Sequence, residues 1–75
     1  MSLLQELADS LARDVLAAQA ELGDDRFYEQ VGKLLLEASP TFHEAFMTSI
    51  RIRLAEQRGR AFLDRILQAK RAGKA

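Results

Sequence analysis

Apolar residues in the first part of the chain recur every three or four positions, which is the spacing of one face of an α-helix. Ser2 is followed three residues later by Gln5, a capping-box pattern that predicts where this helix begins. Gly23 suits the left-handed conformation that often ends a helix. The pattern predicts a first helix over about residues 3–22. Its apolar side chains are Leu3, Leu4, Leu7, Leu11, Val15, Ala18 and Leu22.

A second, shorter helix is predicted over about residues 26–38. Asp24 or Asp25 can cap it, because a carboxylate accepts hydrogen bonds from the first free amides and favours the positive end of the helix dipole. Leu36 points away from the apolar face of this helix, and Leu16 does the same on the first helix. The face itself consists of Phe27, Val31, Leu34, Leu35 and Ala38.

A third helical element begins at Pro40, because Ser39 is a good cap and proline fits the first helical position. No further proline follows, and only Gly59 interrupts the sequence before about Ala72. The sequence therefore predicts either one long helix over about 40–72 or two helices hinged near Gly59. Residues 72–75 are expected to form a frayed tail.

The third element carries apolar residues on two nearly opposite sides, about 160° apart at 100° per residue. One stripe, which can pack on the first two helices, consists of Phe46, Met47, Ile50 and Leu54. The other must meet another part of the chain after a bend, or a second subunit. It consists of Ile52, Ala55, Phe62, Leu63 and Ile66, with Gly59 among them where a close helix crossing is possible. The predicted self-association residues are Ile52, Gly59, Phe62, Leu63 and Ile66.

With no strand pattern and no repeat, the chain is expected to be a single all-α domain over residues 1–75. A chain of this size buries only about 60% of its unfolded surface. It has no cysteine and one histidine, so disulfides and a zinc site of its own cannot compensate. Oligomerisation is the remaining way to stabilise the fold. We therefore expect an oligomeric helical bundle, and a homodimer in particular.

Charge is unevenly distributed although the net charge is zero. Residues 1–38 hold eight acidic and three basic side chains, for a net charge of −5, and residues 39–75 hold three acidic and eight basic ones, for +5. Such asymmetry can mark a basic arm that binds nucleic acid. We favour the alternative, in which the two halves pack against each other or against a second copy.

Arginines on the third element form two rows. Spacings of three and four residues predict a chain of pairs through Arg53, Glu56, Arg60 and Asp64. The other row, Arg51, Arg58 and Arg65, has no acidic residue at those spacings. We expect its partners to be acids near the first loop, from the same chain or another copy; the alternatives are plain solvation and an external anion such as phosphate. The acids are Glu21, Asp24, Asp25 and Glu29.

No catalytic or phosphate-binding motif is present, and the neighbour of His43, Glu44, points elsewhere on a helix. We expect a non-enzyme without metal or cofactor. The uncharged apolar runs are too short for membrane insertion, and the absence of cysteine fits a cytoplasmic protein. The predicted function is a self-associating interaction or regulatory module with an unidentified protein partner. The alternative is a nucleic-acid-binding accessory protein that uses Arg51, Arg58 and Arg65.

Overall fold

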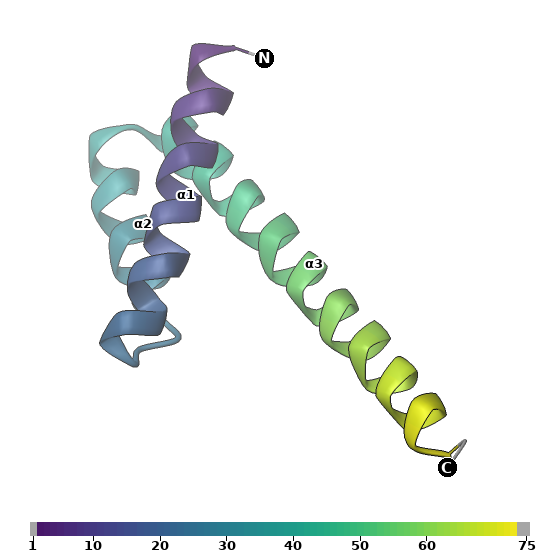
Figure 1. The fold of residues 1–75 in the computed structure, drawn as a ribbon. Coiled ribbons are helices and arrows are strands. Elements are labelled where there is room, and N and C mark those ends of the chain that lie inside the picture. The colour runs from purple at the N-terminus through teal and green to yellow at the C-terminus, as the bar shows by residue number, and fades with distance from the viewer. Residues whose placement is uncertain (1, 74–75) are drawn as a thin grey trace.

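The computed structural model describes residues 2–73 and contains three helices: α1 (Leu3–Leu22), α2 (Phe27–Ala38) and α3 (Pro40–Gly73). In Figure 1, α1 and α2 lie side by side against the first half of α3, whose second half projects away from them. The predicted all-α fold is confirmed. None of the helices in this described range is both long and apolar enough to cross a membrane.

Two helix starts and one helix end follow the predicted local signals. The Ser2 hydroxyl accepts a hydrogen bond from the Gln5 amide at 3.1 Å, and the Ser2 amide donates to the Gln5 side chain at 3.5 Å. Gly23 ends α1 with a φ of 68°, a left-handed conformation that glycine adopts without a steric cost. At the start of α3, the Ser39 hydroxyl accepts from the Phe42 amide at 3.2 Å.

The predicted cap of α2 is wrong, because α2 begins at Phe27 and neither aspartate caps it. Asp24 instead accepts a hydrogen bond from the Arg26 amide at 3.0 Å, which closes the loop before the helix. Within the first turn of α2, the Tyr28 amide donates to the Gln19 side chain of α1 at 2.7 Å. Gln19 is buried. Its side chain satisfies the Tyr28 amide, which has no local side-chain cap.

The centre of the core consists of five buried side chains from α1 and α3: Ala8, Ala12, Val15, Phe46 and Ile50. The buried side of α1 is thus rotated from the predicted leucine stripe towards its alanines. Leu3, Leu7 and Leu22 are exposed, whereas Leu16 packs against the core. Small alanine side chains let α1 approach α3 closely, which leaves the longer leucines at the edges of the contact.

α2 also differs from the predicted face, because Leu34 is exposed and Gly32 is buried. A Cβ atom at Gly32 would lie 3.3 Å from the Met47 sulfur, so the missing side chain allows α2 to pack closely on α3. Phe27, Val31 and Leu35 pack against the core as predicted.

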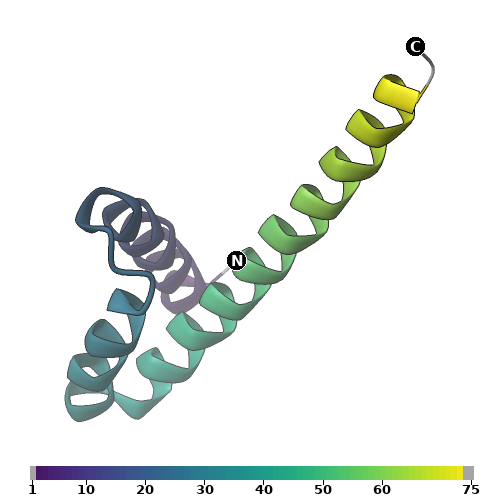
Figure 2. The same cartoon turned by 90° about the horizontal axis from the view of Figure 1, so that it is seen from below.

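α3 is one continuous helix through Gly59, so the predicted alternative of a hinge is wrong. A single glycine costs about 1 kcal/mol of helix propensity, which the helix formers around it can offset. Every residue from Ala55 to Gly73 is exposed, and we call this stretch the projecting segment. Figure 2 shows it extending away from α1 and α2. Ala72 and Gly73 are helical, and the rest of the predicted frayed tail lies outside the described residues.

The projecting segment gives the molecule an elongated shape, with extents of 55 × 29 × 14 Å and a radius of gyration of 15.9 Å. A compact domain of this length has a radius of gyration of about 11 Å. The structure exposes 5760 Å² of surface. A compact monomer of the same mass exposes about 4,600 Å². The chain therefore leaves about 1,100 Å² uncovered that a compact fold of its size would bury.

Candidate self-association face

One side of α3 stays free of α1 and α2 along most of the helix, and we call it the open face. Seven residues make nearly two helical turns, so side chains at that spacing lie on the same side. Two such series form the open face: Thr41, Thr48, Ala55 and Phe62, and beside them Ala45, Ile52, Gly59 and Ile66.

The distal half of the open face is apolar. All five predicted self-association residues lie on it or at its edge, and its large side chains are exposed by 47% at Leu63 to 65% at Ile52. A Cβ atom at Gly59 would meet nothing within 4 Å, so this glycine makes no close crossing within the chain. The structure therefore brings the predicted residues together but, within residues 2–73, nothing packs on them.

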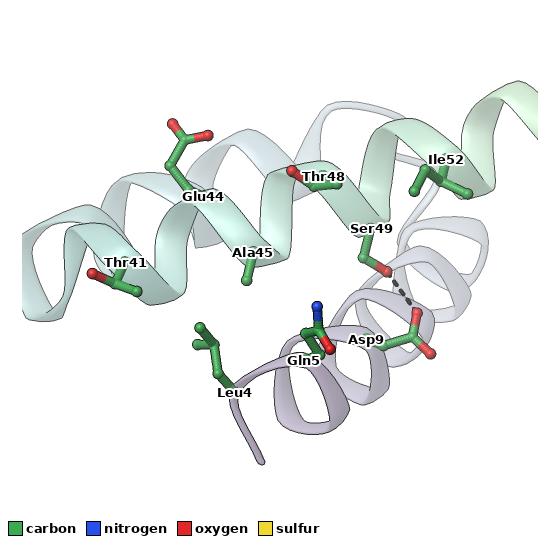
Figure 3. A pocket seen from close by; sticks show the side chains of 9 residues that line it. All are labelled: Leu4, Gln5, Asp9, Thr41, Glu44, Ala45, Thr48, Ser49 and Ile52. Atoms are coloured by element: carbon green, nitrogen blue, oxygen red, sulfur yellow. Dashed lines mark hydrogen bonds between the residues drawn. The ribbon is translucent and has the colours of Figure 1, made fainter. Parts of the chain in front are cut away.

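The proximal half of the open face borders a groove of about 550 Å³ between α1 and α3. Most of the α3 side chains that line the groove are short, so they do not fill it (Figure 3). Its lining residues are Leu4, Gln5 and Asp9 of α1 and Thr41, Glu44, Ala45, Thr48, Ser49 and Ile52 of α3. Sequence reasoning missed this groove, because it exists only where α1 crosses α3.

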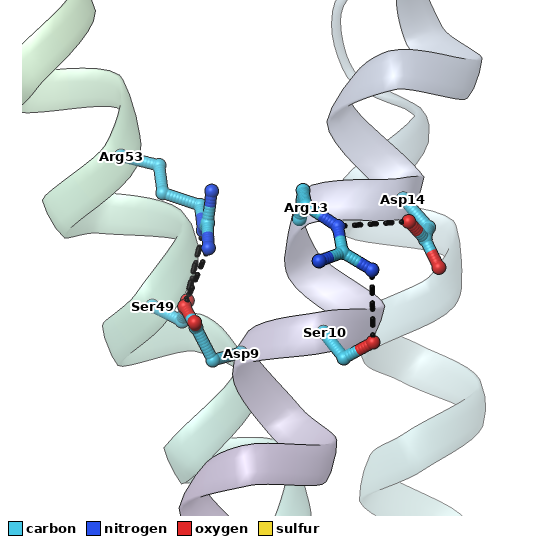
Figure 4. Close-up of polar contacts among 6 residues, drawn as sticks. All are labelled: Asp9, Ser10, Arg13, Asp14, Ser49 and Arg53. Atoms are coloured by element: carbon cyan, nitrogen blue, oxygen red, sulfur yellow. Dashed lines mark hydrogen bonds and ion pairs between the residues drawn. The ribbon is translucent and has the colours of Figure 1, made fainter.

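Asp9 connects the two helices at the end of the groove. One of its carboxylate oxygens accepts hydrogen bonds from the Ser49 hydroxyl at 2.7 Å and from the Arg53 guanidinium at 2.8 and 3.1 Å (Figure 4). These bonds, first that from Ser49 and then that from Arg53, lower the pKa of Asp9 below its usual value. Arg53 is therefore held by α1 and not by Glu56, which corrects the predicted start of the paired row.

The rest of that row is formed only in part. Arg60 binds Glu56 at 2.8 Å, and the hydrogen bond to this carboxylate raises the pKa of Arg60. Asp64 makes no ion pair with any residue of the described chain. Pairs as exposed as Arg60 and Glu56 contribute little to stability.

Arg51, Arg58 and Arg65 are exposed beside the open face, and none forms an ion pair within residues 2–73. Of the acids expected to pair with them, Glu29 binds Arg26 at 3.1 Å. Asp24 and Asp25 line a hollow with Gln57 of α3 but form no ion pair with this row. The Arg65 guanidinium lies over the Phe62 ring, 5.6 Å from its centre. This row is thus available to a carboxylate or phosphate from outside the chain.

Among the described residues, no cluster of three or more histidine, cysteine, aspartate or glutamate side chains could hold a metal ion. Comparison of the chain with protein-family models, curated proteins and solved structures finds no significant match. The open face of α3 is therefore the feature from which a function is argued.

Proposed function

We propose that this protein is a non-enzymatic helical module that forms a homodimer through the open face of α3 and acts in protein–protein interaction or regulation. The observation that carries the proposal is the exposed apolar stripe, which no part of the described chain covers. Large apolar side chains gathered on one exposed helix face are typical of an interface, whereas single exposed leucines are ordinary.

The uncovered area supports a second copy as the occupant. A standard interface buries about 800 Å² on each partner. The chain exposes about 1,100 Å² more than a compact monomer of its mass, so one dimer contact can cover most of the excess. A homodimer also adds stability, which an isolated chain this short is expected to lack.

Leu63→Asp tests the proposal against a matched control. Each copy of the dimer loses about 1.5–3 kcal/mol of apolar burial. The two losses together raise the dissociation constant by at least about a hundred-fold. The control is Leu36→Asp, because Leu36 on α2 is exposed to a similar degree, 49% against 47%, but lies outside the open face.

The measurement is the molar mass of both variants by light scattering over a range of concentrations. We expect Leu63→Asp to be monomeric where Leu36→Asp remains dimeric. Equal masses for the two variants would show that the wrong surface has been chosen.

A second candidate function, nucleic-acid binding, is favoured by the unpaired row Arg51, Arg58 and Arg65. Each guanidinium group of the row can bind a phosphate, and Arg65 on Phe62 offers a flat surface for a base. Against it stand the zero net charge of the chain and the apolar stripe beside the row.

Salt dependence tests this second candidate. Three phosphate contacts predict a slope of about −2.7 for the logarithm of the association constant against that of salt concentration, at −0.9 per contact on duplex DNA. Replacing the three arginines with glutamine should remove that slope. Fluorescence anisotropy with a labelled duplex measures both, and an absence of binding at low salt would eliminate the candidate.

A further inference from the structure

The geometry points to an antiparallel dimer in which the projecting segment of each copy lies in the groove between α1 and α3 of the other. This inference rests on the proposed self-association and adds its orientation and register. In this dimer, the proximal half of the open face of one copy contacts the distal half of the open face of the other copy.

Side-chain size along the open face favours this arrangement. The proximal half presents Thr41, Ala45 and Thr48 at the groove, and the distal half presents Phe62 and Ile66. When two copies of α3 run in opposite directions about a point between residues 53 and 54, a large side chain meets a small one in three of four layers. These layers pair Phe62 with Ala45, Ile66 with Thr41 and Ile52 with Ala55, and the fourth pairs two small residues, Gly59 and Thr48.

This register places residues 55–66 of one copy along the groove of the other, which follows α3 from Thr41 to Ile52. A twofold axis then fills both grooves at once, because the contact is isologous.

Charge favours the same orientation. Residues 3–54 carry nine acidic and five basic side chains, for a net charge of −4, whereas the projecting segment carries two acidic and five basic ones, for +3. The antiparallel dimer lays each positive segment on the negative body of the other copy. It also brings Arg65 close to Glu44 of the second copy, at the rim of the groove.

One contact of this register is unfavourable. Arg51 of one copy approaches Arg58 of the other near the twofold axis. Both side chains are exposed, so solvent and salt screen most of the repulsion.

A parallel dimer loses these advantages. It places Phe62 against Phe62 and Ile66 against Ile66, whereas the layers at Ala55 and Gly59 then contain only small residues. It also puts two positive segments side by side and leaves both grooves empty. Packing and charge thus reject the parallel alternative together.

Single cysteines test the orientation cleanly, because the chain has none of its own. Thr41→Cys and Ile66→Cys both alter exposed side chains, so neither disturbs the core. Oxidation of an equimolar mixture should give a disulfide between the two variants, resolved by mass spectrometry. A disulfide between two copies of Ile66→Cys would overturn the antiparallel inference.

A distance measurement gives a second readout. Gln68 lies on the side of α3 opposite the open face, so a nitroxide at Gln68→Cys leaves the contact intact. We expect about 45 Å between the two labels in the antiparallel dimer, from the rise of 1.5 Å per residue. A parallel dimer gives at most about 30 Å, since the helices then lie side by side in register.

The outcomes separate this inference from the proposed function. A dimer with the short label distance or the symmetric disulfide would overturn the orientation and leave self-association standing. A chain that is monomeric at all concentrations tested would overturn both.

Discussion

Asp9 shows how a single residue fixes the geometry of the candidate site. Its carboxylate joins Ser49 and Arg53, which stand 40 and 44 positions further along the chain. The three side chains hold α1 across α3 at the end of the groove, so the groove keeps its width. Arg53 is partly shielded from solvent, with an exposed fraction of 32%, which makes its geometry better defined than that of the other arginines.

Asp9→Asn should destabilise the fold at neutral pH and have less effect in acid. The folded state lowers the pKa of Asp9, so the stabilisation is present above the unfolded pKa and is lost as pH falls through the folded value. We expect the difference in melting temperature between the two proteins to shrink below about pH 4. Thermal unfolding followed by circular dichroism from pH 7 to pH 2 measures it, and a constant difference would contradict the role given to this carboxylate.

Among the elements, the helix boundaries set by local chemistry could be predicted, whereas the cap of α2 could not, because its Tyr28 amide binds Gln19 of α1. Ser2, Gly23 and Ser39 each act through hydrogen bonds or backbone conformations within a few residues. Buried faces could be predicted only in part. Leu34 is exposed and Leu16 is packed, because the faces depend on where alanine or glycine lets two helices approach. The groove could not be predicted, since its two walls are distant in sequence.

The open face could be predicted in its residues but not in what covers it. The sequence predicted that Ile52, Phe62, Leu63 and Ile66 share one side of the third element, and the structure confirms that geometry. That a second copy covers them stays a prediction.

The projecting segment should be the least stable element of an isolated chain. Most helical stability in proteins comes from the packing of one face against a neighbour, and the projecting segment is exposed along its whole length. Backbone amides of residues 55–73 should therefore exchange with solvent quickly in dilute protein and much more slowly at high concentration, when a second copy covers the helix.

Hydrogen exchange read by mass spectrometry at two concentrations measures this effect. Residues 12–19 of α1 provide the internal control, since they contain the buried Ala12, Val15 and Gln19 and none of them lines the groove. Protection of the projecting segment that does not change with concentration would argue against intermolecular cover.

The whole molecule is an acidic body with a basic, apolar helix extending from it. Its radius of gyration of 15.9 Å exceeds the value of about 11 Å for a compact domain of the same length. The excess lies in the projecting segment, in which every residue is exposed. In the proposed dimer, the projecting segment of each copy lies on the other copy, where its positive charge meets acidic side chains and its apolar residues are covered.

Sedimentation equilibrium of the unaltered protein measures its self-association without any substitution. We expect the molar mass to rise with concentration from the chain mass of 8.4 kDa to twice that value, as dimerisation through the open face requires. A mass of 8.4 kDa that does not change up to millimolar concentration would contradict it, because the apolar face of α3 would then be stable in water without a partner.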